Sequence, residues 1–576
     1  MREGKRAMAA YRMGVRLWLG LLIGGGLLLL AAATRAEDAT LRVGLKPRLE
    51  AGEVARVEVT LDLAAPSVAA GEVLLQAPIV RAMAPTAIID PQGVTARDAA
   101  GPLSLAIDDD PPDPSQFRQD RRWRAERATV GDVQVRYAAV PRTITPQTRP
   151  GPLYDMRREG SGFYGSGAIL LALPPEGWPR PVRLSWDFSD YPAGARGASS
   201  LGEGDIEATV PREGLASAIL MAGPLNSQPS DGQGDFVGYW ITPPVYDLAA
   251  VLQRLEPAYQ AFARFFGDEA TPFRVFMRTT PTFAGGGSGG YRSFIFGQVE
   301  GEDRDIDGLL NLLAHETLHN WLNGLGEETS QWWSEGATSY YTEVLSHRVG
   351  LTTVEQFGRG MNDFARLYYE NPRSNLPNDE VTRLFFSDSD AQVVPYQRGP
   401  LYFAQLDAMI RRASNGTHRV DDLVTALIAA RREGGPYSRD AWIDLVRGEL
   451  GEAGVANFEA MMAGEPLDLP PDLLGPCFDR EATIYQRFQP GFRVDDQGVV
   501  TRVTAGSAVE QAGLAVGDVL VDPRGWREVE QQAPGPVALA IRRGEAVVSI
   551  PFMPWGPAKE GYRWVRSATP EAQCGV

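Results

Sequence analysis

The hydrophobic residues of this chain change their spacing twice along the sequence, and this change limits the folds that are open to it. Between residues 37 and 235, apolar and polar residues alternate in segments such as 54–63, 133–140 and 181–188. A period of two is typical of β-strands with one buried face. Proline- and glycine-rich stretches separate these segments, so the sequence predicts a β-rich N-terminal domain over residues 37–235.

From Asp247 onward the apolar residues recur with helical spacing, for example over residues 248–267. This pattern predicts a mainly helical domain over residues 236–475. A Pro/Gly-rich join at 464–476 marks its end, and strand-like patterns return around one short helical segment in residues 476–576. The predicted fold class is therefore α+β with several domains.

Length and composition agree with several globular domains. The chain has 576 residues, which is too long for a single core. With 44% hydrophobic and 22% charged residues, it has the composition of an ordinary globular protein. Its formal net charge of -17 argues against binding the phosphate backbone of a nucleic acid, so we expect no nucleic-acid partner.

The N-terminus has the composition of an export signal. Basic residues precede an apolar run over residues 17–33, and small residues follow around Thr34 and Ala36. This order predicts a signal peptide over residues 1–36, cleaved near Ala36, and a periplasmic or extracellular protein. The alternative is an uncleaved membrane anchor, because the run approaches the roughly 20 residues that span a bilayer.

The chain has two cysteines, Cys477 and Cys574. Export into an oxidising compartment allows a disulfide between them, which would tie the C-terminal tail to the start of its domain. The alternative is a pair of buried free thiols.

A metal site is indicated by NLLAHETLHN, residues 311–320, which holds two of the four histidines of the chain. On a helix, His315 and His319 lie one turn apart on one face, so both imidazoles can bind one zinc ion. Glu316 is offset around the helix and can act as the general base for a water molecule. Because this five-residue pattern also arises by chance in ordinary helices, the prediction depends on a third ligand.

Glu335 is the predicted third ligand. It stands in the segment QWWSEGATSYYTEVL, where the small residues after it would let this helix pack tightly against the first. The alternative makes Glu335 a solvated residue in the first turn of a helix that Ser334 caps, and such capping is compatible with ligation. Three other carboxylates are rival ligands, namely Glu327, Glu328 and Glu343.

Tyr396 is the last predicted member of the site. It stands immediately before a predicted helix in the segment VVPYQRGPLYFAQLDAMI. A phenol at a zinc site can donate a hydrogen bond to the oxyanion of a tetrahedral intermediate. On its own, a tyrosine at this place would more often be a packing residue.

These motifs together resemble the gluzincin zinc metallopeptidases, and most closely the glycyl aminopeptidase family with its C-terminal PDZ domain. HETLH at 315–319, WWSEGATSYY around Glu335 and VPYQRG around Tyr396 follow the order of that family. AILMAGPL at 218–225 resembles the strand that closes the family's N-terminal domain. GPCFDR at 475–480 resembles the lead into its C-terminal domain.

The resemblance implies a β-sandwich-like N-terminal domain, a thermolysin-like helical catalytic domain and a PDZ domain. By motif position, it implies that His315, His319 and Glu335 bind one Zn²⁺ per chain. Glu316 would be the general base and Tyr396 the oxyanion stabiliser. Peptides or proteins would be the substrates.

One departure from the family concerns a glycine-rich strand upstream of the zinc helix. In aminopeptidases of this clan, that strand carries a glutamate that binds the free amine of the substrate. The corresponding segment is FAGGGSGGYRSF, residues 283–294, which has no acidic residue. The small residues of this segment would let a peptide pair with the backbone as an added strand. The candidate substrate-binding residues are Gly286, Gly287, Ser288, Gly289 and Gly290. A flexible loop is the alternative, and aminopeptidase and endopeptidase activity both stay open.

Residues 491–521 are similar to a bacterial PDZ domain, and residues 537–552 supply a closing hairpin. PDZ domains bind peptide C-termini as an added strand, and the turn at 490–492 is the candidate for the carboxylate-binding loop. The alternative is a β-rich cap that only supports the catalytic domain.

The sequence therefore predicts an exported zinc metallopeptidase that acts on peptides. The alternative function is a peptide-binding or chaperone-like envelope protein with a weak or vestigial peptidase site. A membrane partner is expected only if the N-terminal segment is uncleaved.

Overall fold

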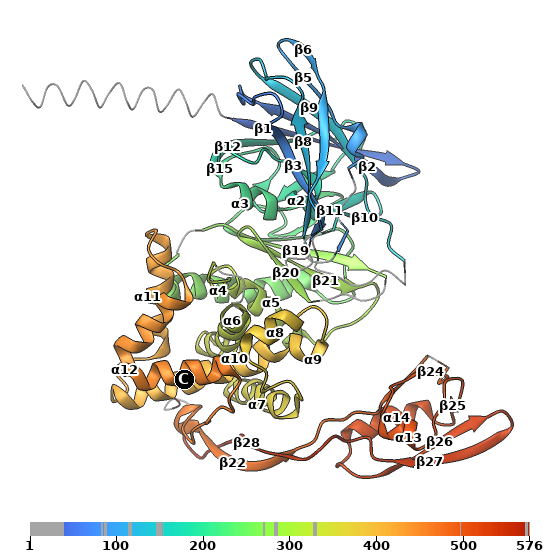
Figure 1. The fold of residues 1–576 in the computed structure, drawn as a ribbon, viewed down its shortest axis with the longest axis vertical. Helices are drawn as coiled ribbons and strands as arrows, with labels where there is room; N and C mark the ends of the chain where they lie inside the picture. The colour runs from blue at the N-terminus through green and yellow to red at the C-terminus, as the bar shows by residue number, and fades with distance from the viewer. Residues whose placement is uncertain are drawn as a thin grey trace, which may run out of the picture. The chain divides into compact units, whose positions relative to one another are not determined.

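The structure is a computed structural model (Figure 1), and it describes residues 40–570 and Cys574 except 82–83, 86–88, 113–117, 146–152, 154, 269–270, 282–285, 327–330 and 496. The predicted signal segment 1–36 and the rival ligands Glu327 and Glu328 lie outside the described residues. Within the described part of the chain, no helix combines the length and apolarity needed to cross a membrane. The chain forms two compact units, of which the first ends at Asn320 and the second begins at Trp321. The predicted domain boundaries stay predictions.

The first unit begins with a seven-stranded sheet of order β15-β12-β1-β2-β9-β5-β6. β1 (Leu41–Glu50) pairs antiparallel with β2 (Glu53–Leu63), and β12 (Arg180–Trp186) and β9 (Val133–Ala139) extend the sheet on either side. Along β1 and β2, buried residues alternate with half-buried or exposed ones. These strands confirm the alternating segments predicted from the sequence. The remaining strands are β5 (Thr95–Asp98), β6 (Gly101–Leu103) and β15 (Ile206–Val210).

Two further sheets complete this core, with the orders β4-β3-β8-β7 and β10-β11-β16-β13-β14. Leu75 of β3 and Trp123 of β8 belong to one hydrophobic cluster with Leu61 of β2, so the sheets share a core. The segment predicted as a strand at 218–225 forms β16 (Ile219–Gly223). The other elements are β3 (Val73–Arg81), β4 (Ala84–Pro85), η1 (Pro91–Gly93), β7 (Leu105–Asp109), β8 (Gln119–Ala125), β10 (Arg157–Glu159), β11 (Gly162–Ser166), α2 (Gly167–Leu170), β13 (Arg196–Ser199), β14 (Gly202–Glu203) and α3 (Arg212–Ser217).

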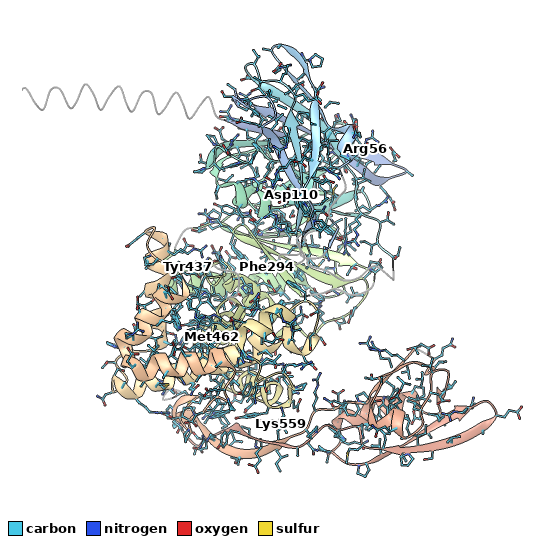
Figure 2. The ribbon with its side chains drawn as sticks, in the orientation of Figure 1. Arg56, Asp110, Phe294, Tyr437, Met462 and Lys559 are labelled. Atoms are coloured by element: carbon cyan, nitrogen blue, oxygen red, sulfur yellow. A yellow bond between two sulfur atoms is a disulfide. The ribbon has the colours of Figure 1, made fainter. Side chains whose placement is uncertain are left out.

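A fourth sheet, of order β17-β18-β19-β21-β20, ends the first unit and carries the glycine-rich segment on its edge. β18 (Phe236–Trp240), β19 (Phe273–Thr280) and β21 (Ser293–Val299) are parallel, and α4 (Leu248–Phe265) makes the crossover that parallel pairing requires. Phe294 of β21 is fully buried (Figure 2). The edge strand β20 (Gly287–Gly290) pairs antiparallel with β21. The remaining elements are β17 (Asn226–Gln228) and α5 (Ile306–Leu318).

Helices form the first part of the second unit, as the helical periodicity predicts. α6 (Gln331–Arg348) packs along α10 (Val394–Ala413), and a Cβ placed on Gly336 would lie 2.8 Å from the Cα of Gly399. The small residues after Glu335 were predicted to pack against the helix that carries the two histidines. In the structure, Gly336 makes this close contact with α10 instead. The other helices are α7 (Val354–Glu370), α8 (Asn378–Leu384), α9 (Ser389–Gln392), α11 (Val420–Arg432) and α12 (Arg439–Ala463).

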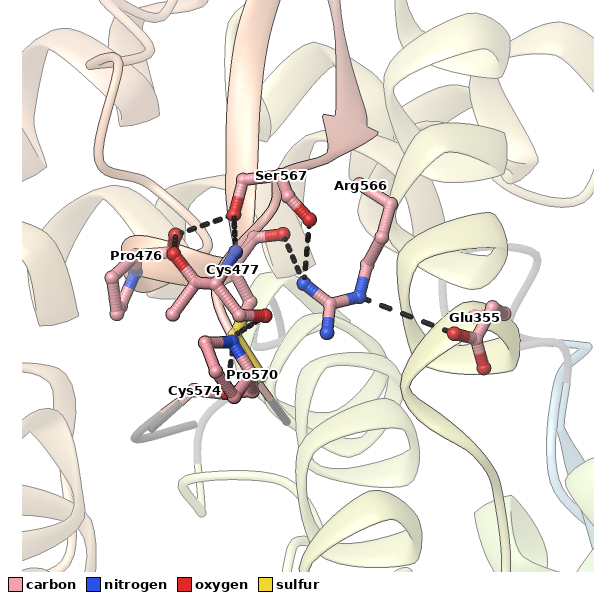
Figure 3. The surroundings of a disulfide bond; sticks show 8 residues. Glu355, Pro476, Cys477, Arg566, Ser567, Pro570 and Cys574 are labelled. Carbon is pink, nitrogen blue, oxygen red and sulfur yellow. Dashed lines mark hydrogen bonds and ion pairs between the residues drawn. A yellow bond between two sulfur atoms is a disulfide. The ribbon is translucent and has the colours of Figure 1, made fainter. Parts of the chain in front are cut away.

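A disulfide joins Cys477 and Cys574 in the second unit (Figure 3). It lies beside an antiparallel pair formed by β22 (Phe478–Tyr485) and β28 (Lys559–Arg566). This pair is attached to α7, because the Asn362 side chain donates a hydrogen bond to the Trp564 carbonyl at 2.7 Å and accepts one from the Trp564 N–H at 2.8 Å. The disulfide therefore lies beside a strand pair that is fixed to α7.

The segment between β22 and β28 has a hydrophobic cluster of its own, which includes Val500, Ile541 and Ile550. β26 (Val537–Arg543) and β27 (Ala546–Phe552) form the predicted hairpin, and α13 (Ala508–Gln511) is the predicted short helix. The PDZ assignment itself stays a prediction. The other elements are η2 (Gly475–Cys477), β23 (Phe492–Val494), β24 (Val500–Val503), β25 (Val519–Leu520), α14 (Pro523–Glu528) and η3 (Val529–Gln531).

Candidate active site

Helix α5 carries both histidines of the HETLH motif at its C-terminal end. The start of the helix is fixed by Asp305, whose side chain accepts a hydrogen bond from the Gly308 N–H at 2.9 Å. Leu313 and Leu318 are fully buried and pack the helix into the core. His319 follows as the cap residue and keeps helical backbone angles. The prediction of a helix through this motif is confirmed.

The two histidine rings meet across one helical turn. The Nε2 atoms of His315 and His319 lie 3.1 Å apart, and their ring planes are 86° apart. Two nitrogen ligands at about 2.05 Å from a tetrahedral zinc ion would be about 3.3 Å apart. The observed spacing therefore fits two ligands of one metal ion.

A carboxylate completes this group of donor atoms. One ligand atom from each of His315, His319 and Glu335 lies within 4.8 Å of the other two. Among the residues that the structure describes, this is the only group of three or more His, Cys, Asp or Glu side chains with such a spacing. All three residues are half-buried. Two imidazoles and one carboxylate are a donor set that suits zinc, and three protein ligands leave a coordination position for water or substrate.

The packing of α6 positions Glu335. Two residues before it, Trp333 is fully buried, and its indole N–H donates a hydrogen bond to the Tyr437 hydroxyl at 3.0 Å. The same indole meets the Trp442 ring edge-on, with centroids 5.1 Å apart. Immediately after it, Gly336 makes the close contact with α10. Glu335 is thus held between two tightly packed positions.

The alternatives for this helix are resolved in part. α6 begins at Gln331, so Ser334 lies inside the helix, and the alternative in which Ser334 caps the helix is wrong. Sequence patterns locate helix starts less well than helix interiors. Glu343 is buried two turns further along α6, where its carboxyl group lies against Gly360 of α7. Glu343 is not part of the group of three donors.

Glu316 lies against the glycine-rich strand. It is buried, and a Cβ placed on Gly287 of β20 would lie 2.6 Å from its Oε1 atom and closer still to its carbon atoms. Such distances are far below van der Waals contact, so a side chain at position 287 would displace the carboxyl group. The missing side chain therefore brings the strand backbone directly against the predicted general base.

The opposite face of β20 is fastened to the core. Ser288 is only 8% exposed, and its Oγ atom accepts a hydrogen bond from the Leu153 N–H at 2.9 Å. The structure therefore places residues 287–290 in an anchored strand and not in a flexible loop. The role of Leu153 could not be predicted from the sequence, because 135 residues separate the two partners and no local pattern connects them.

Tyr396 lies in the first turn of α10 and not before the helix as predicted. The helix begins at Val394, and Pro395 occupies a position where its missing N–H costs nothing. Tyr396 is half-buried. Two residues further, the Arg398 guanidinium donates a hydrogen bond to the Leu376 carbonyl at 2.6 Å, and burial lowers the pKa of Arg398 to about 10. Arg398 thus stays charged at neutral pH and anchors this end of the helix.

Comparison with known proteins identifies a shared fold. No family model matches the sequence, and no curated protein matches it. The chain is similar to the solved structure of an aminopeptidase N family protein from Idiomarina loihiensis, with a TM-score of 0.69 and 14% identity over 93% of this chain and 99% of that one. A mutant M1 zinc metallopeptidase from Deinococcus radiodurans bound to Tyr-Ser-Ala has a TM-score of 0.44 and 17% identity over 75% of this chain and 95% of that one. The first similarity shows that the chain shares the mixed α/β multidomain fold of the Idiomarina protein.

Proposed function

We propose that the chain is an exported zinc-dependent metallopeptidase. The observation that carries this proposal is the group of donor atoms from His315, His319 and Glu335, all within 4.8 Å of one another. Such a set suits a catalytic zinc site, in which the fourth position is left to water or substrate. The fold shared with an aminopeptidase N family protein supports the same function.

In this proposal Glu316 is the general base. Bound zinc would supply a Lewis acid that polarises the scissile carbonyl and activates water at neutral pH. The Glu316 carboxylate accepts a proton from the attacking water and then delivers it to the leaving amine. Its contact with Gly287 restricts where this carboxylate can lie, which supports a defined geometry for the transfer.

Tyr396 is the proposed donor to the oxyanion. Its hydroxyl would donate a hydrogen bond to the carbonyl oxygen as negative charge develops there. The first turn of α10 is a stiff support for this group, because Arg398 holds it through the Leu376 carbonyl.

The substrate would lie along β20. One side of an edge strand has backbone groups that no sheet neighbour pairs, and an extended peptide can add there. The proposed substrate-binding residues are Gly286, Gly287, Ser288, Gly289 and Gly290. Four of the five lack a side chain, which allows close approach of a peptide backbone.

The C-terminal domain is proposed to bind peptide C-termini, as a PDZ domain does. In the turn at 490–492, Gly491 has a φ of 75°, and a Cβ placed on it would lie 2.6 Å from the Cβ of Ser507. The turn therefore requires glycine, and it remains the candidate carboxylate-binding loop. The Cys477–Cys574 disulfide fits the proposed location in the periplasm or outside the cell.

The test combines metal analysis with activity on a mixed peptide library. We expect about one zinc ion per chain, as a single site of three protein ligands would hold. Glu316→Gln should keep the zinc and lower kcat/KM by roughly 10²- to 10⁴-fold, because it removes the general base. His315→Ala should lose zinc and activity together.

Two results would contradict this proposal. One is a purified wild-type chain without stoichiometric zinc, and the other is a Glu316→Gln variant that cleaves as fast as the wild type. Either result would favour the peptide-binding or chaperone-like function.

A further inference from the structure

Strand β20 has two different faces, because side chains alternate along a strand. One face carries Ser288 and Gly290, and it is packed: Ser288 is buried, and a Cβ on Gly290 would lie 2.9 Å from a backbone carbonyl oxygen. The other face carries Gly287 and Gly289. Because Gly287 lies against Glu316, this second face is the one at which the proposed chemistry occurs.

Beyond Gly287, the second face is open. A Cβ placed on Gly289 would meet no atom of the described chain within 4 Å, and Gly289 is exposed. A strand rises about 3.3 Å per residue, so Gly289 lies roughly 6.6 Å further along the strand. A peptide that pairs antiparallel with β20 would place the residues before its scissile bond alongside Gly289. At the same rise per residue, the stretch from Gly287 to Gly289 lies alongside about two extended substrate residues.

The charge of this segment does not suit recognition of a free N-terminus. An enzyme that removes single N-terminal residues must bind the α-ammonium group of its substrate, and desolvating that charge without a partner is costly. Residues 283–294 contain no Asp or Glu, and their one charged residue is Arg292, a cation like the α-ammonium itself. β20 therefore offers no counter-charge on the face that meets Glu316.

We infer that this chain cleaves peptides internally and accepts substrates that continue past Gly289 without a free N-terminus. The open face of Gly289 provides the space, and the segment carries no acidic side chain that would hold a free amine there. This inference rests on the proposed function, because it names the substrate class of the same site.

The first experiment uses one internally quenched peptide in two forms, with a free and with an acetylated N-terminus. We expect kcat/KM values that agree within about threefold, because the ammonium group would contact only solvent. Mass spectrometry should find internal cleavage in both forms.

A different outcome would overturn the inference. If acetylation lowers kcat/KM by about 30-fold or more, a buried charge pair has been lost. Products that shorten one residue at a time from the N-terminus would agree with that result. The inference then fails while the proposed peptidase function stands. If neither form of the peptide is cleaved, both the inference and the proposed peptidase function fail.

A binding measurement gives a readout that does not depend on turnover. The Glu316→Gln variant is titrated with the two forms of the peptide, each labelled at its C-terminus. We expect Kd values within about threefold of each other, for the same reason of solvent screening. A Kd at least about tenfold weaker for the acetylated form would mean that the chain binds the amine, against the inference.

Gly289→Glu tests the position directly, and Gly289→Gln is its neutral control of similar size. Both side chains would extend into open space, and Gly289 does not have the positive φ that disfavours side chains. For a peptide that begins two residues before its scissile bond, Gly289→Glu should increase the preference for the free over the acetylated form by about tenfold or more relative to Gly289→Gln, because the ammonium group would then lie beside position 289 and gain a charge-assisted hydrogen bond. Equal preferences in the two variants would show that substrate does not pass Gly289, and the inference would fail.

Discussion

Replacing Gly287 by alanine should impair catalysis without unfolding the chain. The added Cβ would lie 2.6 Å from Oε1 of Glu316, whereas ordinary contacts begin at 3.4 Å. Glu316 or the strand must therefore move by roughly 1 Å, and a misplacement of about 1 Å can lower a rate about 100-fold. This factor corresponds to about 2.7 kcal/mol of activation free energy. We expect kcat/KM of Gly287→Ala to fall by about that factor of 100.

The assay is hydrolysis of an internally quenched peptide, with zinc content and Tm measured on the same preparations. The Glu316→Gln variant gives the value of kcat/KM in the absence of the general base. The kcat/KM of Gly287→Ala should lie between that value and the value of the wild type. Gly448→Ala is the matched control, because Gly448 lies in α12, outside the proposed site, and its Cβ would meet nothing within 4 Å. Full activity of Gly287→Ala with normal zinc content would refute the reasoning, since Glu316 would then not be held against β20 when it acts.

Three further outcomes are expected. Gly336→Ala should lower the free energy of unfolding by about 1–3 kcal/mol relative to Gly448→Ala, because only the methyl group at 336 would meet the backbone of α10. Urea denaturation measures this difference, and equal stabilities would contradict a close helix contact. Cys574→Ser should destabilise the second unit by about 2–4 kcal/mol, because it removes a cross-link that constrains the unfolded chain. Calorimetry should show that a reductant lowers the Tm of the wild type and leaves that of the variant unchanged. Finally, two hydrogen bonds from Arg543 hold the pKa of the Asp518 carboxyl below its usual value. This contribution to stability is present above the unfolded pKa of about 3.9 and is lost as the pH falls through the lower folded pKa. The difference in Tm between wild type and Arg543→Ala should therefore shrink as the pH is lowered below about 4, and a constant difference would contradict this linkage.

Local patterns were sufficient to predict the elements whose exposure repeats along the chain. The alternating segment at 54–63 forms β2, and the helical spacing around His315 and His319 forms α5. In both cases the period of the apolar residues reports which face is buried, and this information lies within a few neighbouring residues. The sequence alone therefore predicts that the two histidines share a helix face.

Contacts between distant segments could not be predicted in the same way. No local pattern shows that Gly287 lies against Glu316, or that Ser288 accepts a hydrogen bond from Leu153. The sequence of the glycine-rich segment is equally compatible with a loop and with a strand, because glycine has no side chain that could show an alternation of apolar and polar residues. Its pairing with β21 and its contact with α5 decide the matter in the structure.

Helix starts were the other source of error. α10 begins before Tyr396, and α6 begins before Ser334, which the alternative for Glu335 had made its cap. The first turn of a helix has backbone N–H groups without intrahelical partners, so several residues compete to satisfy them and the sequence signal is weak. These shifts are small along the chain, yet they determine which residues project from a rigid turn.

The disulfide at the base of the C-terminal segment also determines the outcome of proteolysis. Cys477 and Cys574 enclose residues 478–573 in a covalent ring, and β22 and β28 pair over their full length beside it. A single cut of the backbone anywhere inside this ring leaves the two pieces joined through sulfur. One nick in an exposed loop therefore opens the ring without releasing a fragment, and release requires a second cut or a reductant.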